Sequence, residues 1–239
     1  MLLDIIIPVY QEQDNILKTL NLLNDNLRSK ANILICYDYD EDPSLIEIKK
    51  FRSKHLKINL VKNKGQGAAT AIKTGLFFSN SKFVLIYNAD DFHNSSRIDE
   101  MLKLGQGGYD IIAPSRYMKG GKSQGVRFSK ALIAYLGSWV CFHILRFPLR
   151  DITYCFRMFS RKVIENFELE SKHGFTFIIE YTVKAHRKNF KMIEIPGDFR
   201  ERIKGKSKFK LIEWTPHYAR WAIYALNTQL KKFLNDKDK

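Results

Sequence analysis

Short apolar runs alternate with longer, helix-like stretches along the first half of the chain. The apolar runs occupy residues 3–9, 33–37, 58–61 and 83–87, and helical spacing occupies residues 14–28, 43–54 and 68–78. Apolar runs of this length without polar alternation are typical of strands that are buried on both faces. Because helices separate the strands, the pattern predicts an α/β fold with a mostly parallel central sheet and helices on both faces.

The second half of the chain is less regular. Strand-like runs occur at residues 109–114, 155–159 and 191–195, and helical spacing occurs at residues 129–145 and 175–188. The apolar stretch from Ala131 to Leu149 is interrupted by His143, Arg146 and Pro148. It is therefore expected to form a buried helix and not a membrane span.

Residues 209–234 have the spacing of an amphipathic helix. Lysines and arginines surround one apolar stripe, which consists of Leu211, Trp214, Tyr218, Trp221 and Ala225. Indole and phenol rings favour the headgroup region of a bilayer, so this segment predicts a basic helix at a membrane surface. A helix that packs on its own domain or on a second subunit would show the same stripe. The chain is accordingly divided into a main domain, 1–208, and a basic amphipathic helix with a tail, 209–239.

The composition adds a strong positive charge. Forty lysines and arginines against 25 acidic residues give a net charge of +15, which favours a phosphorylated substrate or an anionic surface as partner. The pattern of a nucleic-acid-binding module is missing from the sequence, so nucleic acid is not an expected partner. Three cysteines without paired spacing, together with a first segment unlike a signal peptide, predict a cytoplasmic location.

Polar and acidic residues follow each predicted strand of the first half. These segments are residues 8–12, 38–42, 63–67 and 88–91. The carboxyl ends of parallel strands meet at one edge of a sheet, where α/β proteins bind their ligands. Acidic residues that recur at this edge predict a site for a cation and a nucleotide.

Several short motifs stand in a fixed order along the chain. They are Ile6-Ile7-Pro8-Val9-Tyr10-Gln11-Glu12, Lys64-Gly65-Gln66-Gly67, Asn88-Ala89-Asp90, Ser115-Arg116-Tyr117, the segment 150–157, and the segments 199–202 and 205–208. The ordered set resembles the inverting glycosyltransferases of family 2, and among them the dolichol- and polyprenyl-phosphate mannose and glucose synthases. This resemblance implies a Rossmann-type GT-A domain with a nucleotide-sugar-binding half, 1–110, and an acceptor-binding half, 111–208.

The resemblance implies that a hexose is transferred from a nucleotide-sugar of the GDP-mannose or UDP-glucose type. It assigns donor binding to Pro8, Tyr10, Glu12, Asp38, Lys64, Gly67, Asn88, Ala89 and Asp90. The diphosphate leaving group gains charge as its bond breaks, so a carboxylate-held Mg²⁺ or Mn²⁺ ion is expected. Asp90 is the expected central ligand and a catalytic residue, with Asn88 and Asp91 as further metal ligands.

The expected acceptor is a polyprenyl phosphate at the inner face of the membrane. Because this acceptor is already an anionic nucleophile, it requires cationic positioning more than a general base. Arginine forks bind phosphate in bidentate geometry, and the candidates for this contact are Arg116, Lys130, Arg202, Ser207 and Lys208. The resemblance also gives Asp151 a supporting catalytic role, and Arg202 is counted among the catalytic residues.

Three departures from the family pattern affect the expected site. Asn88 replaces the first aspartate of the Asp-x-Asp motif and contributes no charge, and Phe92 cannot coordinate a metal where a Gln or Ser is common. The segment 38–42 replaces an Asp-Asp-Gly-Ser loop. Tyr154 and Cys155 stand in place of a small Ser-Gly pair. The metal site is therefore expected to be weakened, and the room for the acceptor or the sugar is expected to be reduced.

Two other functions fit the same residues. A family 2 enzyme that acts on a glycan or another soluble acceptor in cell-surface polysaccharide assembly would require a general base, and Asp151 is the candidate. A non-catalytic relative that binds a nucleotide-sugar or a lipid phosphate would explain why Asn88 and Phe92 replace metal ligands. A homo-oligomer is compatible with all of these functions.

Overall fold

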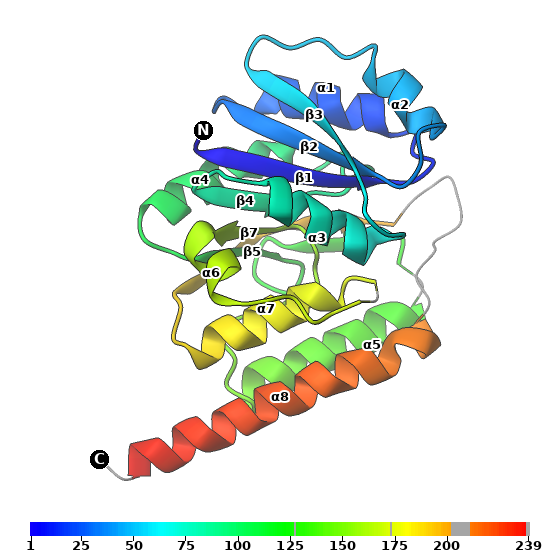
Figure 1. The fold of residues 1–239 in the computed structure, drawn as a ribbon. Helices are drawn as coiled ribbons and strands as arrows, with labels where there is room; N and C mark the ends of the chain where they lie inside the picture. The colour runs from blue at the N-terminus through cyan, green and yellow to red at the C-terminus, as the bar shows by residue number, and fades with distance from the viewer. Residues whose placement is uncertain (127, 173, 202–210, 238–239) are drawn as a thin grey trace.

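A computed structural model describes residues 1–126, 128–172, 174–201 and 211–237 of the chain (Figure 1). In the first half, strands alternate with helices in the order β1 (Leu3–Val9), α1 (Ile16–Asn26), β2 (Ala31–Tyr37), α2 (Pro43–Ile48), β3 (Leu56–Lys62), α3 (Ala68–Phe78) and β4 (Phe83–Ile86). The predicted strand 3–9 and helix 68–78 agree with β1 and α3 to the residue. The predicted helix 43–54 is too long, because α2 ends at Ile48.

The second half contains more elements than the sequence pattern predicts. Its elements are a 3₁₀ turn (Ser95–Arg97), α4 (Ile98–Gln106), β5 (Ile111–Ser115), β6 (Lys122–Gln124), α5 (Phe128–Trp139), a π-helical turn (Val140–Ile144), β7 (Arg157–Ser160), α6 (Arg161–Asn166), α7 (Thr176–Arg187), β8 (Met192–Pro196), β9 (Asp198–Arg200) and α8 (Leu211–Lys237). Helices α4 and α6 and the short strands β6 and β9 are additions to the predicted elements.

Seven strands form one sheet in the order β3-β2-β1-β4-β7-β5-β8. Strands β1 to β4 are parallel, and β5 is parallel to β8, whereas β7 is antiparallel to both of its neighbours. Helices α1 and α2 lie on one face of the sheet, and α3 lies on the other (Figure 1). The predicted α/β class with a mostly parallel sheet is confirmed. Strands β6 and β9 form a separate two-stranded sheet.

The central strands are buried on both faces, as their continuous apolar sequence predicts. Every residue of β4 and all of β1 except Pro8 are buried in the main core. Helix α3 packs closely on this core through Gly75, because a Cβ atom there would lie 2.7 Å from the Ile6 Cγ2 atom and 2.8 Å from the Cys36 Sγ atom. The sheet therefore holds the carboxyl ends of β1 to β4 in a fixed arrangement.

A second, smaller core lies under α7, the π-helical turn and α8. It contains Cys141, Leu145, Ile179, Val183, Trp221 and Ala225, among others. The predicted stripe of the C-terminal helix therefore packs inward at Trp221 and Ala225, and the expectation that these residues face a membrane is wrong. The opposite side of α8 exposes Ile223, Leu226 and Leu230.

Helix α5 is not the buried helix that its apolar sequence predicts. Six of its large apolar side chains are between 42% and 80% exposed, and they belong to Phe128, Leu132, Ile133, Tyr135, Leu136 and Trp139. In the part of the chain that the structure describes, these side chains are left exposed although the sequence of the helix is apolar. Among the described residues, none of the helices is both long and apolar enough to cross a bilayer.

Candidate active site

The loop after β1 is held by the loop after β2. The Gln11 backbone has a φ of 57°, and its N–H donates to both oxygens of the Asp42 carboxylate at 3.0 and 3.3 Å. The Glu12 N–H donates to the Ser44 Oγ at 2.7 Å. The edge of the Tyr10 ring meets the Tyr39 ring at a centroid distance of 5.8 Å. These contacts set two adjacent tyrosines at the carboxyl edge of the sheet, where a nucleoside base is expected.

Asp38 joins the ends of β2 and β3. Its two carboxylate oxygens accept hydrogen bonds from the Asn63 amide at 2.7 Å and from the Gly67 N–H at 2.8 Å. Gly67 precedes the first turn of α3 with a φ of 84°, a conformation that favours glycine. The Lys64 ammonium lies 4.5 Å from the centroid of the Phe77 ring. The predicted donor residues Asp38, Lys64 and Gly67 are thus brought to one part of the molecule, and Asn63 is an additional residue that orients Asp38.

The loop after β4 borders a small cleft. Its lining includes Asn88, Asp90, His93, Asp198, Arg200 and Glu201, so β9 forms the wall opposite the loop. The Asn88 Oδ1 accepts a hydrogen bond from the Cys155 thiol at 3.3 Å. Burial raises the pKa of Cys155 to about 11, so it remains a thiol at neutral pH. The cleft thus brings Asp90 close to Asp198, Arg200 and Glu201, which lie more than 100 positions later in the chain.

Asp91 is engaged as a buried hydrogen-bond acceptor. Its carboxylate accepts from the His93 N–H at 3.0 Å, from the Asn94 N–H at 3.1 Å and from the Asn94 side-chain amide at 2.7 and 2.9 Å. Burial raises the pKa of Asp91, and the hydrogen bonds from His93 and Asn94 oppose that effect without cancelling it. Both oxygens thus accept hydrogen bonds, although Asp91 also lines the cleft, and its role as a metal ligand stays a prediction.

The residues that remain for a metal ion are few. The predicted set offers the carboxylates of Asp90 and Asp91, and the Asn88 amide is neutral. Among the described residues, there is no group of three or more His, Cys, Asp or Glu side chains that could hold a metal ion. This donor set fits a cation such as Mg²⁺, which takes one or two carboxylates and completes its shell with phosphate oxygens and water.

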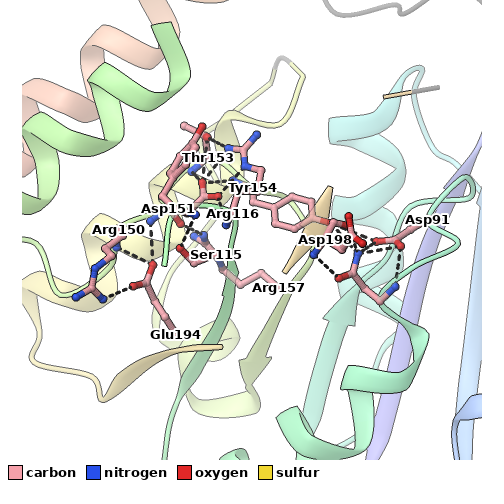
Figure 2. A network of polar contacts seen from close by, with 12 residues as sticks. Asp91, Ser115, Arg116, Arg150, Asp151, Thr153, Tyr154, Arg157, Glu194 and Asp198 are labelled. Carbon is pink, nitrogen blue, oxygen red and sulfur yellow. Dashed lines mark hydrogen bonds and ion pairs between the residues drawn. The ribbon is translucent and has the colours of Figure 1, made fainter. Parts of the chain in front are cut away.

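Arg116 and Asp151 form a buried ion pair on the acceptor side (Figure 2). The guanidinium donates to the two Asp151 oxygens at 2.7 and 2.9 Å, and the Arg116 N–H donates at 3.1 Å. The Thr153 and Tyr154 N–H groups complete the acceptor shell of Asp151 at 3.3 and 3.2 Å. Burial raises the pKa of Asp151, but the Arg116 charge and its hydrogen bonds lower it by more, so the pKa lies below its ordinary value.

Two further residues hold the segment that carries this ion pair. The Arg157 guanidinium donates to the Asp151 carbonyl oxygen at 2.7 Å, and burial lowers the pKa of Arg157 to about 10. The Glu194 carboxylate accepts from the Arg150 and Asp151 N–H groups at 2.6 and 2.9 Å. Asp151 is therefore ionised and surrounded by donors, which suits a positioning role better than proton abstraction.

Several predicted residues cannot be placed in this geometry. Arg202, Ser207 and Lys208 lie outside the described residues, and so does the side chain of Lys130. Asn94 and Asp198 lie beside the cleft although neither was predicted for the site. Asn94 contacts Asp198 across 104 positions of sequence, and short-range spacing carries no signal for such a contact.

Several solved structures resemble this fold. The glucosyl-3-phosphoglycerate synthase of Mycobacterium tuberculosis, solved with Mn²⁺, UDP and glucosyl-3-phosphoglycerate, matches with a TM-score of 0.65 and 9% identity. The match covers 95% of this chain and 79% of that chain. The same enzyme solved with Mg²⁺ and UDP gives a TM-score of 0.64. At such low identity the likeness shows the fold alone, and it confirms the GT-A-like arrangement.

The sequence comparison identifies the family. The profile of glycosyl transferase family 2 matches residues 4–167, which is more than half of the chain. The chain therefore belongs to glycosyl transferase family 2, as its ordered motifs predict.

Two curated relatives are similar over part of their length. A dolichol-phosphate mannosyltransferase of Pyrococcus furiosus is 27% identical over 227 residues, which are 92% of this chain and 63% of that protein. A polyprenol monophosphomannose synthase of Mycolicibacterium smegmatis is 27% identical over 139 residues, which are 53% of this chain and 52% of that protein. This chain thus matches less than two thirds of the length of either relative.

Proposed function

We propose that this protein transfers a hexose from a nucleotide-sugar to a polyprenyl phosphate at a membrane surface. The observation that carries the proposal is the apolar face of α5, which we define as Phe128, Leu132, Ile133, Leu136 and Trp139. Exposed apolar patches of this kind mark surfaces for membrane or protein contact. The names of the two curated relatives, a dolichol-phosphate mannosyltransferase and a polyprenol monophosphomannose synthase, support a lipid acceptor.

The apolar face of α5 is connected to the acceptor side of the site. Tyr135 of α5 packs edge-on against Tyr117 at a centroid distance of 5.3 Å. Tyr117 follows Arg116, whose guanidinium pairs with Asp151. A lipid that lies with its chain along α5 would therefore bring its phosphate towards the segment that the Arg116–Asp151 pair holds. The basic residues of the chain would add attraction to anionic lipids, about 1 kcal/mol for each one near the surface.

The state of Asp151 favours a phosphate acceptor over a hydroxyl acceptor. A sugar hydroxyl must lose a proton during transfer, and Asp151 was the candidate base for that reaction. Its oxygens accept from Arg116, Thr153 and Tyr154, and its pKa lies below the ordinary value because the Arg116 charge and hydrogen bonds outweigh the effect of burial. A lipid phosphate is already ionised and does not require this base.

On the donor side, the proposal uses the residues at the strand ends. Tyr10, Glu12 and Asp38 are proposed to bind the nucleoside, and Asp90 to hold a Mg²⁺ or Mn²⁺ ion against the diphosphate. When bound, the ion neutralises the charge that develops on the leaving group. Arg202, Ser207 and Lys208 are proposed to contact the acceptor phosphate. We propose a cytoplasmic location at the inner membrane face for this reaction.

The test is transfer of labelled hexose from GDP-mannose and UDP-glucose to undecaprenyl phosphate in anionic vesicles, with Mn²⁺ or with EDTA. Label in the lipid phase that depends on the metal is the expected result. Ile133→Glu, on the apolar face of α5, should reduce both vesicle sedimentation and transfer without changing nucleotide binding. The matched control is Ile46→Glu on α2, because Ile46 and Ile133 are similarly exposed, at 61% and 54%.

Three outcomes would contradict the proposal. Transfer to a soluble glycan with none to the lipid would favour polysaccharide assembly. Nucleotide binding without any transfer would indicate a non-catalytic relative. Equal transfer by the wild type and Ile133→Glu, with dimerisation lost only in the variant, would assign the apolar face of α5 to a second subunit.

A further inference from the structure

Asn94 connects the loop that carries Asp90 with strand β9. Its side-chain oxygen accepts a hydrogen bond from the Asp198 N–H at 2.9 Å, and its side-chain nitrogen donates to the Asp198 carbonyl oxygen at 2.8 Å. In an antiparallel sheet, a residue of the neighbouring strand makes the same two bonds, one to the N–H and one to the C=O of its partner residue. Asn94 is buried, so water does not readily replace these bonds.

The same amide also contacts the loop after β4. Its nitrogen lies within 2.9 Å of both Asp91 oxygens and of the Tyr154 hydroxyl, and its two hydrogens are shared among these acceptors and Asp198. The Tyr87 hydroxyl donates to the Asp91 carbonyl oxygen at 2.9 Å, which fixes the loop from the sheet side. Figure 2 shows the Tyr154 ring between the Asp151 group and the pair formed by Asp91 and Asp198. We call Asp91, Asn94, Tyr154 and Asp198 the Asn94 clip.

Strand β9 has other contacts as well, because Phe199 packs against the main core and its ring centroid lies 5.5 Å from the Arg116 guanidinium. It pairs with β6, and all three residues of β6 are exposed. Gly197, which precedes β9, donates its N–H to the Ser115 carbonyl oxygen at 3.0 Å, and the Phe199 ring centroid lies 5.6 Å from that of Tyr154. The chain continues from β9 through Glu201 towards the segment that contains Arg202 and Lys208. Asp198, Arg200 and Glu201 line the same cleft as Asp90, so the placement of β9 sets the separation of the two cleft walls.

We propose that Asn94 is a positioning residue that sets the register between Asp90 and β9, and so aligns the donor with the acceptor phosphate. The inference rests on the proposed function for its acceptor, whereas its structural part depends only on the contacts of the clip. The Asn94 amide offers an acceptor to Asp198 and donors to Asp91 in one planar group. Without this amide, the loop after β4 and strand β9 would not keep the same separation.

The test compares Asn94→Asp and Asn94→Leu with a matched control, Asn166→Asp, on the exposed end of α6. Asn94→Asp keeps the shape but sets a second carboxylate against Asp91. Hydrogen exchange of peptides that contain residues 198–201 should become about tenfold faster in both Asn94 variants, because the hydrogen bonds between Asn94 and Asp198 are lost. Peptides of β1 provide the internal reference for global unfolding.

The functional readout separates transfer from donor binding. In both Asn94 variants, kcat for transfer to undecaprenyl phosphate should fall about 100-fold, the effect of a 1 Å misplacement. The Kd of UDP or GDP with Mn²⁺ should change less than about threefold, because Asp38 and Tyr10 lie outside the clip. Hydrolysis of the nucleotide-sugar by water should persist, since water needs no alignment by β9.

Each result has a distinct meaning. Unchanged exchange at 198–201 in both Asn94 variants overturns the inference, and so does a loss of nucleotide affinity as large as the loss of transfer. If the wild type does not transfer to the lipid at all, the proposed acceptor is wrong, and exchange at 198–201 then decides whether the clip holds β9. Transfer by Asn94→Leu at the wild-type rate would also contradict the proposal that Asn94 is a positioning residue.

Discussion

Replacing Arg116 with methionine leaves the Asp151 carboxylate buried without its main counter-charge. The Asp151 side chain has no exposed surface, and that of Arg116 is only 10% exposed, so solvent screens the pair weakly. Removal of one partner from a buried pair typically costs 3–5 kcal/mol, because the other charge stays desolvated. Asp151 keeps the N–H groups of Thr153 and Tyr154 and the nearby charge of Arg157. We therefore expect a cost of about 3 kcal/mol.

Urea unfolding followed by circular dichroism measures this cost. In a thermal unfolding experiment, the same loss of about 3 kcal/mol lowers the melting temperature of a domain of this size by about 6 to 12 °C. The double variant Arg116→Met/Asp151→Leu should recover part of the loss, because it removes both charges together. The matched control is Arg97→Met on the exposed Arg97–Glu100 pair, which should change the free energy of unfolding by less than about 0.5 kcal/mol.

Unfolding of Arg116→Met at the same urea concentration as the wild type would show that Arg116 does not stabilise the buried Asp151 carboxylate. If this variant is stable but loses transfer, Arg116 acts directly on the acceptor phosphate, and Asp151 does not depend on it. The pH dependence of the free energy of unfolding provides a second test. Since the pKa of Asp151 is below its ordinary value of 3.8, its stabilisation is present above that pH and is lost as the pH falls. Arg116→Met should weaken this dependence.

Two further predictions follow from other parts of the molecule. Asn88→Asp adds a charged ligand near Asp90, so Mn²⁺ should bind about tenfold or more tightly in the absence of nucleotide, as measured by isothermal titration calorimetry. Equal Mn²⁺ affinity of the wild type and the variant would show that residue 88 does not face the ion. Burial raises the pKa of Asp4, but hydrogen bonds from Ser81, at 2.7 and 2.8 Å, and other groups lower it below 3.8. The protein should therefore lose stability as the pH falls below about 4, and Asp4→Asn should reduce that slope in acid unfolding curves; an unchanged slope would assign it to other carboxylates.

The sequence alone determined the architecture of the donor half. Buried parallel strands need continuous apolar runs, and helices need apolar residues at three- and four-residue spacing, so local pattern predicted β1 to β4 and α1 to α3. The polar residues after those strands follow from the same logic, because chain direction alone places them at one edge of the sheet. The ordered motifs then pointed to glycosyl transferase family 2, which the family match confirms.

Only the tertiary structure decided how the apolar and charged residues are used. The apolar sequence of α5 predicts burial, yet six of its large apolar side chains are exposed in the fold. Asp91 stands beside Asp90 in the sequence, yet it turns to Asn94. Arg116 meets Asp151 across 35 positions, and Asn94 meets Asp198 across 104. Periodicity reports what a residue prefers locally, whereas partners at such separations are chosen by the fold as a whole.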